Sequence, residues 1–281
     1  MRQASAVPPD QPTYWNEEGG QRWVSNIQRV ERMIEPFRTQ LVRHAAPQPG
    51  ECVLDVGCGG GITSAAFAGA VGPSGSVLGL DVSAVILAVA CERYAAVANL
   101  SFALGDAATM PLDAGHFDLV SSRFGVMFFA DPVAAFVNLH SALKPGGRLA
   151  FICWRALDEN PWMADCVRAA FTVLPVPEPQ PPTAPGPFAF ADGARLRDIL
   201  SRSGYTDISI EPHDHVLDLG RIDDAVNQMT HIGPAASAFA AASAAEQAAV
   251  VMAIRTALKP HLSGGSVRMA SGTWLAGARR G

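Results

Sequence analysis

The chain has 281 residues, of which 49% are hydrophobic and 17% are charged, and its formal net charge is −5 at pH 7. This composition indicates a folded globular protein and excludes a disordered chain. The acidic balance, without a dense run of Lys or Arg, argues against nucleic acid or an anionic membrane as the main partner, and no apolar run approaches the length that spans a bilayer.

The first 46 residues are expected to form an N-terminal helical segment in front of a domain that occupies residues 47–281. In its opening stretch, MRQASAVPPDQP, no apolar signal-peptide core is present, and Pro8, Pro9 and Pro12 are expected to prevent a helix. From about residue 19 to residue 46, apolar residues recur at three- and four-residue spacing, which predicts a helix. The five cysteines are scattered without a CxxC pair, which favours reduced thiols, a cytoplasmic location and no metal site.

Strand and helix patterns alternate in the next hundred residues. The predicted strands are CVLDV, SVLGLD, LSFALGD, FDLVSSRF and RLAFICW. The predicted helices between them are ITSAAFAGAV, AVILAVACERYAAV with Ser83 as its N-cap, and PVAAFVNLHSAL. Such alternation is typical of right-handed βαβ units, and it predicts an α/β fold with a parallel sheet that is covered by helices on both faces.

The last third of the chain has a different pattern. A proline-rich loop, residues 175–187, precedes a helix with Asp192 as N-cap and then a strand, YTDISIEPHDHVLDL. Residues 222–262 are rich in alanine and predict two or three helices that are interrupted at Gly233 and Pro234. Since TWLAGARR follows as a final strand, these helices form an insertion before the last strand.

The stretch VLDVGCGGG, residues 53–61, joins a buried strand to four glycines and indicates a ligand site. A phosphate-binding P-loop requires a Lys, and residues 55–72 contain neither Lys nor Arg. A dinucleotide fingerprint requires a third glycine where this chain has Ile62, which weakens that interpretation without removing it.

S-adenosylmethionine is the third candidate ligand, and it has no phosphate to bind. Asp81 ends the second predicted strand, 24 residues after Gly57, where a carboxylate can accept from both ribose hydroxyls. Asp106 ends the third strand, where it can accept from the adenine amino group. Three consecutive strand ends are therefore predicted to direct ligand-binding groups into one crevice.

The chain resembles the class I S-adenosylmethionine-dependent methyltransferases, and in particular the ubiquinone/menaquinone C-methyltransferase-like branch. The resemblance rests on VLDVGCGGG, GLDVSAVILAVA, GDAATMPLDAGHFDLV and LKPGGRLAF. It implies a Rossmann-like, seven-stranded, mostly parallel sheet, with the N-terminal segment over the cofactor. The positions that it implies for cofactor binding are Asp55, Gly57, Cys58, Gly59, Asp81, Val82, Asp106, Ala107 and Arg123. Trp15 and Trp23 are either core residues or cofactor contacts.

The acceptor side has fewer signals. After the fourth strand, SRFGVMFF places aromatic residues where an apolar acceptor would lie, and NPW and PGPFAFAD resemble segments of a bacterial subgroup of the family. The candidate lining residues, for which core packing is the alternative, are Phe124, Phe128, Trp154 and Trp162. His231, in the insertion that is expected to act as an acceptor lid, is the one candidate for a general base. His213 and His215 share a strand face, but no third metal ligand accompanies them.

The sequence thus predicts an enzyme that transfers a methyl group from S-adenosyl-L-methionine to a small, partly apolar acceptor, by C- or O-methylation. Neither nucleic acid nor membrane insertion is expected. Two alternatives stay open: a nicotinamide-dependent oxidoreductase, and a cofactor-binding module without catalytic activity.

Overall fold

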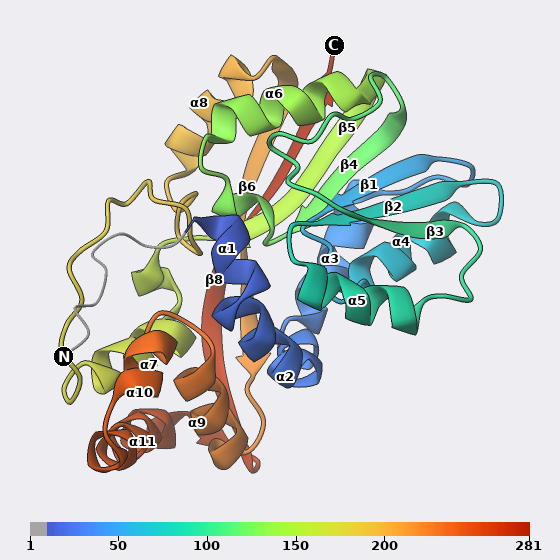
Figure 1. Ribbon diagram of the computed structural model, residues 1–281. Helices are drawn as coiled ribbons and strands as arrows, with labels where there is room; N and C mark the ends of the chain where they lie inside the picture. The colour runs from blue at the N-terminus through green and yellow to red at the C-terminus, as the bar shows by residue number, and fades with distance from the viewer. Residues whose placement is uncertain (1–9) are drawn as a thin grey trace.

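The computed structural model describes residues 10–281, and one twisted sheet runs through this part of the chain (Figure 1). Neighbouring strands lie in the order β3-β2-β1-β4-β5-β8-β6, and a two-residue strand, β7, pairs with β8 only. The strands are β1 (Cys52–Val56), β2 (Ser76–Asp81), β3 (Leu100–Leu104), β4 (Phe117–Arg123), β5 (Leu143–Trp154), β6 (Tyr205–Asp218), β7 (Leu262–Ser263) and β8 (Ser266–Arg280). The first five are parallel to one another, whereas β8 runs antiparallel to β5 and β6. The predicted mostly parallel sheet is confirmed.

Helices cover both faces of the sheet, as the alternating pattern predicts (Figure 1). On one face lie α3 (Glu35–Ala45), α4 (Ile62–Val71) and α5 (Ala84–Arg93), and on the other lie α6 (Pro132–Ala142) and α8 (Gly193–Arg202). The layers meet through side chains without solvent exposure, among them Phe37, Phe67, Phe136 and Phe151. Ser83 and Asp192 cap α5 and α8 as predicted.

The N-terminal segment departs from the expected single helix. It consists of α1 (Gln11–Asn16), α2 (Glu18–Met33) and then α3. Pro36 lies in the first turn of α3, and α2 ends just before it because proline lacks the N–H that would continue the helix and its ring clashes with the preceding turn. Pro12 does not prevent a helix. It stands in the first turn of α1, where no N–H is needed, and Asp10 caps that turn by accepting from the Thr13 amide. Pro8 and Pro9 lie outside the described residues.

The expected helical insertion lies between β6 and β8. It contains α9 (Ile222–His231), α10 (Ala236–Ala241), α11 (Ala244–Leu258) and the short η3 (Lys259–His261), with Gly233 and Pro234 between α9 and α10. The insertion packs against α7 (Pro161–Ala170), a helix that the sequence analysis does not predict. Two further 3₁₀ turns, η1 (Val126–Phe128) and η2 (Leu157–Glu159), follow β4 and β5. Over residues 10–281, none of the helices is both long and apolar enough to cross a membrane.

Candidate functional site

The carboxyl ends of β3, β2, β1 and β4 meet at one edge of the sheet, because these strands are parallel neighbours. Four charged side chains that the sequence analysis singles out stand at these ends, one on each strand or directly after it: Asp106, Asp81, Asp55 and Arg123. The helices α1 and α2 lie against the same edge (Figure 1).

The glycine turn after β1 is held by the end of β2. The amide of Gly57 donates to the Leu80 carbonyl oxygen at 2.8 Å, and the amide of Gly59 donates to Asp81 Oδ2 at 2.8 Å. Both glycines have positive φ, 66° and 56°. A Cβ on Gly57 would lie 2.7 Å from the Cα of Gly125, whereas a Cβ on Gly59 would meet nothing within 4 Å. Gly57 thus allows two backbones to pack, and Gly59 borders open space beside the turn.

Asp81 connects two loops as well as standing at a strand end. Its Oδ1 accepts from the Ser83 amide at 2.9 Å, and its Oδ2 accepts from the Gly59 amide. Burial raises the pKa of this carboxyl, and these amide donors oppose the rise. Carboxylate oxygens have further lone pairs, so both can accept additional hydrogen bonds from a ligand.

Asp55 is 1% exposed, and within residues 10–281 only one of its oxygens has a partner. Ser64 Oγ donates to Oδ2 at 2.6 Å, and Oδ1 is buried with no hydrogen-bond partner in the described residues. Burial raises the pKa of Asp55 to about 6, and the hydrogen bond from Ser64 and the charge of Arg123 oppose this shift.

Arg123 stands on the same sheet face as Asp55, because Asp55 pairs with Ser121 and residues two apart on a strand share a face. Its Nη1 donates to the Ile34 carbonyl oxygen at 3.3 Å, and within residues 10–281 it forms no ion pair. Burial lowers its pKa to about 10. In the described part of the chain, a carboxylate oxygen without a donor thus lies near a guanidinium with unused donors, and this combination is complementary to the ammonium and carboxylate groups of an α-amino acid.

The loop after β3 is fixed by α6. Asp106 Oδ1 accepts from the Ala108 amide at 2.9 Å. Asn138 Nδ2 donates to the carbonyl oxygens of Ala107 and Met110, at 2.9 Å each. Asn138 was not predicted, because a single polar residue on a helix has no spacing that marks it. Cys58, in the glycine turn, is buried, and burial raises the pKa of its thiol, which therefore stays protonated and unreactive.

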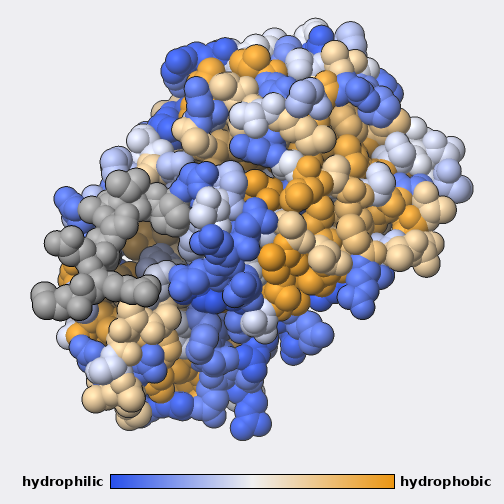
Figure 2. All heavy atoms as spheres, in the orientation of Figure 1, coloured by the Kyte–Doolittle hydropathy of each residue, from blue (hydrophilic) through white to orange (hydrophobic). Residues whose placement is uncertain are grey.

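The N-terminal helices are fastened to the loop after β2. Asn16 Nδ2 donates to the Val82 carbonyl oxygen at 2.8 Å, and Asn16 Oδ1 accepts from the Ala84 amide at 2.9 Å. Ser83 Oγ donates to the Trp15 carbonyl oxygen at 2.6 Å. Figure 2 shows polar residues over α1 and α2 and an apolar region beside them, in the direction of β3. The N-terminal segment therefore covers the strand end that carries Asp81.

The same helices also contact the glycine turn and the aromatic residues after β4. A Cβ on Gly60 would lie 2.6 Å from atoms of both Ile27 and Glu31 of α2. Glu31 forms an ion pair with Arg93 of α5 at 2.8 Å. Trp15 lies edge-on to Trp23 and to Phe128, with ring centroids 5.9 and 5.2 Å apart.

Three of the four predicted acceptor-side aromatics lie together. Phe124 stacks on Trp154, with ring centroids 4.3 Å apart and an interplanar angle of 11°. Trp154 also contacts Trp162 at 5.2 Å, and Phe37 lies edge-on to both Phe124 and Trp154. The fourth, Phe128, lies beside Trp15 instead. Phe37, on α3, was not predicted, because its helical spacing is that of an ordinary core residue.

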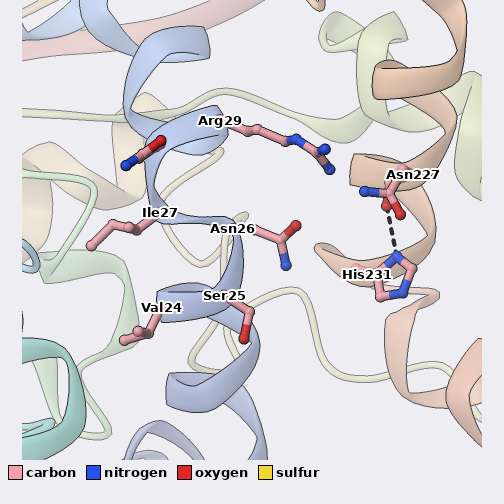
Figure 3. Close-up of a pocket in the computed structure, with 8 residues that line it drawn as sticks. Val24, Ser25, Asn26, Ile27, Arg29, Asn227 and His231 are labelled. Atoms are coloured by element: carbon pink, nitrogen blue, oxygen red, sulfur yellow. Dashed lines mark hydrogen bonds between the residues drawn. The ribbon is translucent and has the colours of Figure 1, made fainter.

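His231 lies apart from these groups, at the end of α9 and exposed. Its Nδ1 is 2.7 Å from the Asn227 carbonyl oxygen (Figure 3). Since a carbonyl only accepts, Nδ1 carries the proton and Nε2 of the neutral ring is an acceptor. Both residues face α2 across a cavity of about 490 Å³, which is lined by Val24, Ser25, Asn26, Ile27, Gln28, Arg29, Asn227 and His231. None of the predicted cofactor residues lines it.

His213 and His215 stand two residues apart on β6, as predicted. In the part of the chain that the structure describes, no group of three or more His, Cys, Asp or Glu side chains could hold a metal ion. The expected absence of a metal stays a prediction.

Comparison with known proteins agrees with the architecture of this edge. Residues 53–147 match the family described as "Methyltransferase domain". Demethylmenaquinone methyltransferase of Staphylococcus carnosus is 37% identical over 111 residues, which are 40% of this chain and 46% of that protein. The chain thus spans about half the length of the relatives that it matches.

Solved structures share the fold over more of the chain. Phosphoethanolamine N-methyltransferase 2 of Haemonchus contortus, in complex with phosphomonomethylethanolamine and S-adenosylhomocysteine, has a TM-score of 0.62 at 16% identity and covers 99% of this chain and 62% of that one. The YcgJ protein of Bacillus subtilis has a TM-score of 0.59 at 16% identity and covers 88% of this chain and 98% of that one. Residues 53–147 thus match a methyltransferase domain and lie within a Rossmann-like fold, and the chain resembles the class I S-adenosylmethionine-dependent methyltransferases of the demethylmenaquinone branch.

Proposed function

We propose that this protein transfers a methyl group from S-adenosyl-L-methionine to a small, partly apolar acceptor. The observation that carries the proposal is the pair formed by Asp55 and Arg123 at the carboxyl edge of β1 and β4. Among the described residues, Asp55 offers a buried oxygen without a donor, and Arg123 offers donors without an anion. These groups fit the ammonium and carboxylate of the methionine arm, and the methyltransferase domain match supports the assignment.

The remaining cofactor contacts follow the order of the strand ends. Asp81, with Val82 beside it, would hold the ribose hydroxyls. Asp106 and the Ala107 amide would hold adenine. The turn from Gly57 to Gly59, including Cys58, would lie against the methionine arm, where Gly59 borders open space.

Bound S-adenosylmethionine supplies a methyl group that its sulfonium has already activated for displacement. The chain would contribute alignment of an acceptor with that group and exclusion of water, and such positioning is worth about 7–11 kcal/mol. The N-terminal helices cover the cofactor edge, and the stacked Phe124 and Trp154 offer an apolar wall beside the end of β4.

A proton acceptor is required only when the acceptor atom carries a proton, as in a phenol. His231 is the candidate, since its Nε2 is the acceptor nitrogen of the neutral ring and the residue lines the cavity between α2 and α9. In this proposal the insertion, residues 222–262, closes over the acceptor.

The similarity to demethylmenaquinone methyltransferases puts hydroquinones and phenols first among the acceptors to be tested. The direct experiment combines a thermal melt with S-adenosylhomocysteine or NADH and a screen with labelled S-adenosylmethionine over hydroquinones, phenols, amines and carboxylates. We expect S-adenosylhomocysteine to raise the melting temperature by mass action and NADH to leave it unchanged. Stabilisation by NADH alone would overturn the proposal in favour of an oxidoreductase. Binding of S-adenosylhomocysteine without turnover of any acceptor would indicate a module without catalytic activity.

A further inference from the structure

Asn160 directly precedes α7 and begins the motif NPW, and the proposed function gives it no role. Its side chain is completely buried and uses every one of its polar groups. Nδ2 donates to the carbonyl oxygens of Ala156 at 3.0 Å, Gly272 at 3.0 Å and Arg155 at 3.3 Å. Oδ1 accepts from the Gly272 amide at 3.0 Å and from Trp162 Nε1 at 3.1 Å. One amide therefore joins the end of β5, the middle of β8 and the indole of Trp162.

The Trp162 indole begins a row of aromatic rings that ends at the proposed acceptor side. Its ring centroid lies 5.2 Å from that of Trp154, at an interplanar angle of 50°. Trp154 in turn stacks on Phe124 at 4.3 Å. The hydrogen bond from Trp162 to Asn160 fixes the rotation of the first ring, and close packing passes that constraint to the next two.

Phe124 is the residue of this row whose backbone conformation is least favourable by itself. Its φ is +67°, in the left-handed region that a residue with a bulky side chain rarely adopts. Such a conformation persists only where the surroundings hold it, and residues of this kind cluster at functional sites. The Phe124 amide donates to the Ile152 carbonyl oxygen at 3.0 Å, and the stack on Trp154 holds the ring.

We infer that Asn160 is a positioning residue, which acts through the Trp162 indole to hold Trp154 and Phe124 in the orientation seen here. The consequence for an acceptor rests on the proposed function, whereas the orientation of the rings does not. In the competing explanation, Asn160 only ties the β5 loop to β8, and the rings would keep their arrangement without it.

Circular dichroism of the Trp154 and Trp162 indoles separates these explanations. These two indoles are expected to give an exciton couplet. Since Trp15 and Trp23 also lie close, at 5.9 Å, the couplet of Trp154 and Trp162 is defined as the part of the signal that Trp154→Phe removes. In Asn160→Asp, an oxygen still faces the Trp162 N–H, but the three bonds donated by Nδ2 are lost. We expect this variant to melt at a lower temperature and to keep most of the couplet.

Asn160→Ala is expected to lose at least half of the couplet. Trp274→Phe is the matched control, since it removes an indole that donates to the Ala191 carbonyl oxygen instead.

If Asn160→Ala does not fold, Trp162→Phe decides the question, because it keeps an aromatic ring and removes the bonded N–H together with part of the indole. The ¹⁹F signal of fluorophenylalanine at position 124, assigned with Phe124→Leu, should lose its ring-current shift in Trp162→Phe and keep it in Trp274→Phe. An undiminished couplet in folded Asn160→Ala, or an undiminished ¹⁹F shift in Trp162→Phe, would overturn the inference.

Calorimetry with S-adenosylhomocysteine is expected to give affinities within threefold of wild type for the Asn160 and Trp162 variants. Failure of the wild type to bind would reject the proposed function and leave the result on ring orientation intact.

Discussion

At the scale of single residues, Asp55 combines a proposed ligand-binding role with a cost to stability. Its pKa in the folded protein is about 6, above the value of about 4 expected when the chain is unfolded. An acid with a raised folded pKa favours the folded state at low pH, and this contribution is lost as pH rises from about 4 to about 6. Two pKa units correspond to roughly 3 kcal/mol as an upper figure.

Asp55→Asn removes this titration and keeps an oxygen that can accept from Ser64. We therefore compare the free energy of unfolding of the variant with that of the wild type by urea titration at pH 4 and at pH 7.5. The difference, variant minus wild type, is expected to be about 1–3 kcal/mol larger at pH 7.5 than at pH 4. Affinity for S-adenosylhomocysteine should fall, because a charge partner of its ammonium is lost.

Asp118→Asn is a control, because the pH dependence of stability that it removes has the opposite sign. Burial tends to raise the pKa of Asp118, but the Cys52 amide and Lys144 outweigh this effect, and the pKa is lowered. The wild type should therefore lose this contribution to stability as pH falls below about 4, whereas the Asp118→Asn variant should not. Equal pH profiles for wild type and Asp55→Asn would contradict the assignment of a raised pKa.

Asp81 offers a second prediction at this scale. Asp81→Ala removes the acceptor for the Gly59 and Ser83 amides as well as the proposed ribose contacts. Each hydrogen bond to a charged group is worth about 1.5–3 kcal/mol, so affinity for S-adenosylhomocysteine should fall at least tenfold by calorimetry. The melting temperature should fall too, because two backbone amides lose their partner. Unchanged affinity would show that Asp81 serves only the two loops.

At the scale of elements, α1 is attached to the loop after β2 by the Ser83 hydroxyl and by the Asn16 side chain, which both donates and accepts. Asn16 Nδ2 and Oδ1 bind backbone groups on both sides of Ser83. Asn16→Ala should weaken this attachment, and we expect S-adenosylhomocysteine to dissociate several-fold faster in stopped-flow measurements. Asn26→Ala is the matched control, because the Asn26 side chain donates to the Arg22 carbonyl oxygen within α2 itself. If both variants release the ligand at the wild-type rate, α1 does not limit exit.

Some positions could be predicted from the sequence and others could not, for a physical reason. The places of Gly57 in a tight turn and of Asp81 and Asp106 at strand ends could be predicted because such places impose local requirements that a few adjacent letters express. Asn16 and Asn160 could not, because their partners lie 66 and 112 residues away along the chain. Such pairs exist only once the sheet order brings the segments together. Helix α7 was missed because only its beginning was interpreted, as part of the motif NPW, and the apolar residues that follow it were not.

At the scale of the whole molecule, α2 links the glycine turn after β1 to the insertion, residues 222–262. Ile27 lies over the glycine turn. On the other side, Arg22 Nη2 donates to Ser237 Oγ of α10 at 3.2 Å, and Gln228 Nε2 of α9 approaches Met33 Sδ at 2.8 Å. A ligand that settles α2 against the glycine turn is therefore expected to settle α9 and α10 as well.

The three helices of the insertion are not equally anchored, and this difference makes the lid proposal testable. Helix α11 buries Val250, Ile254 and Leu258 almost completely, whereas α10 buries only Ala236. Hydrogen exchange of the empty protein should be fastest in α10 and slow in α11 and in the central strands β1 and β4. Saturating S-adenosylhomocysteine should slow exchange in α2, α9 and α10 and leave α11 unchanged. Exchange in α10 as slow as in the central strands, and insensitive to S-adenosylhomocysteine, would show that the insertion completes the core instead of closing over a ligand.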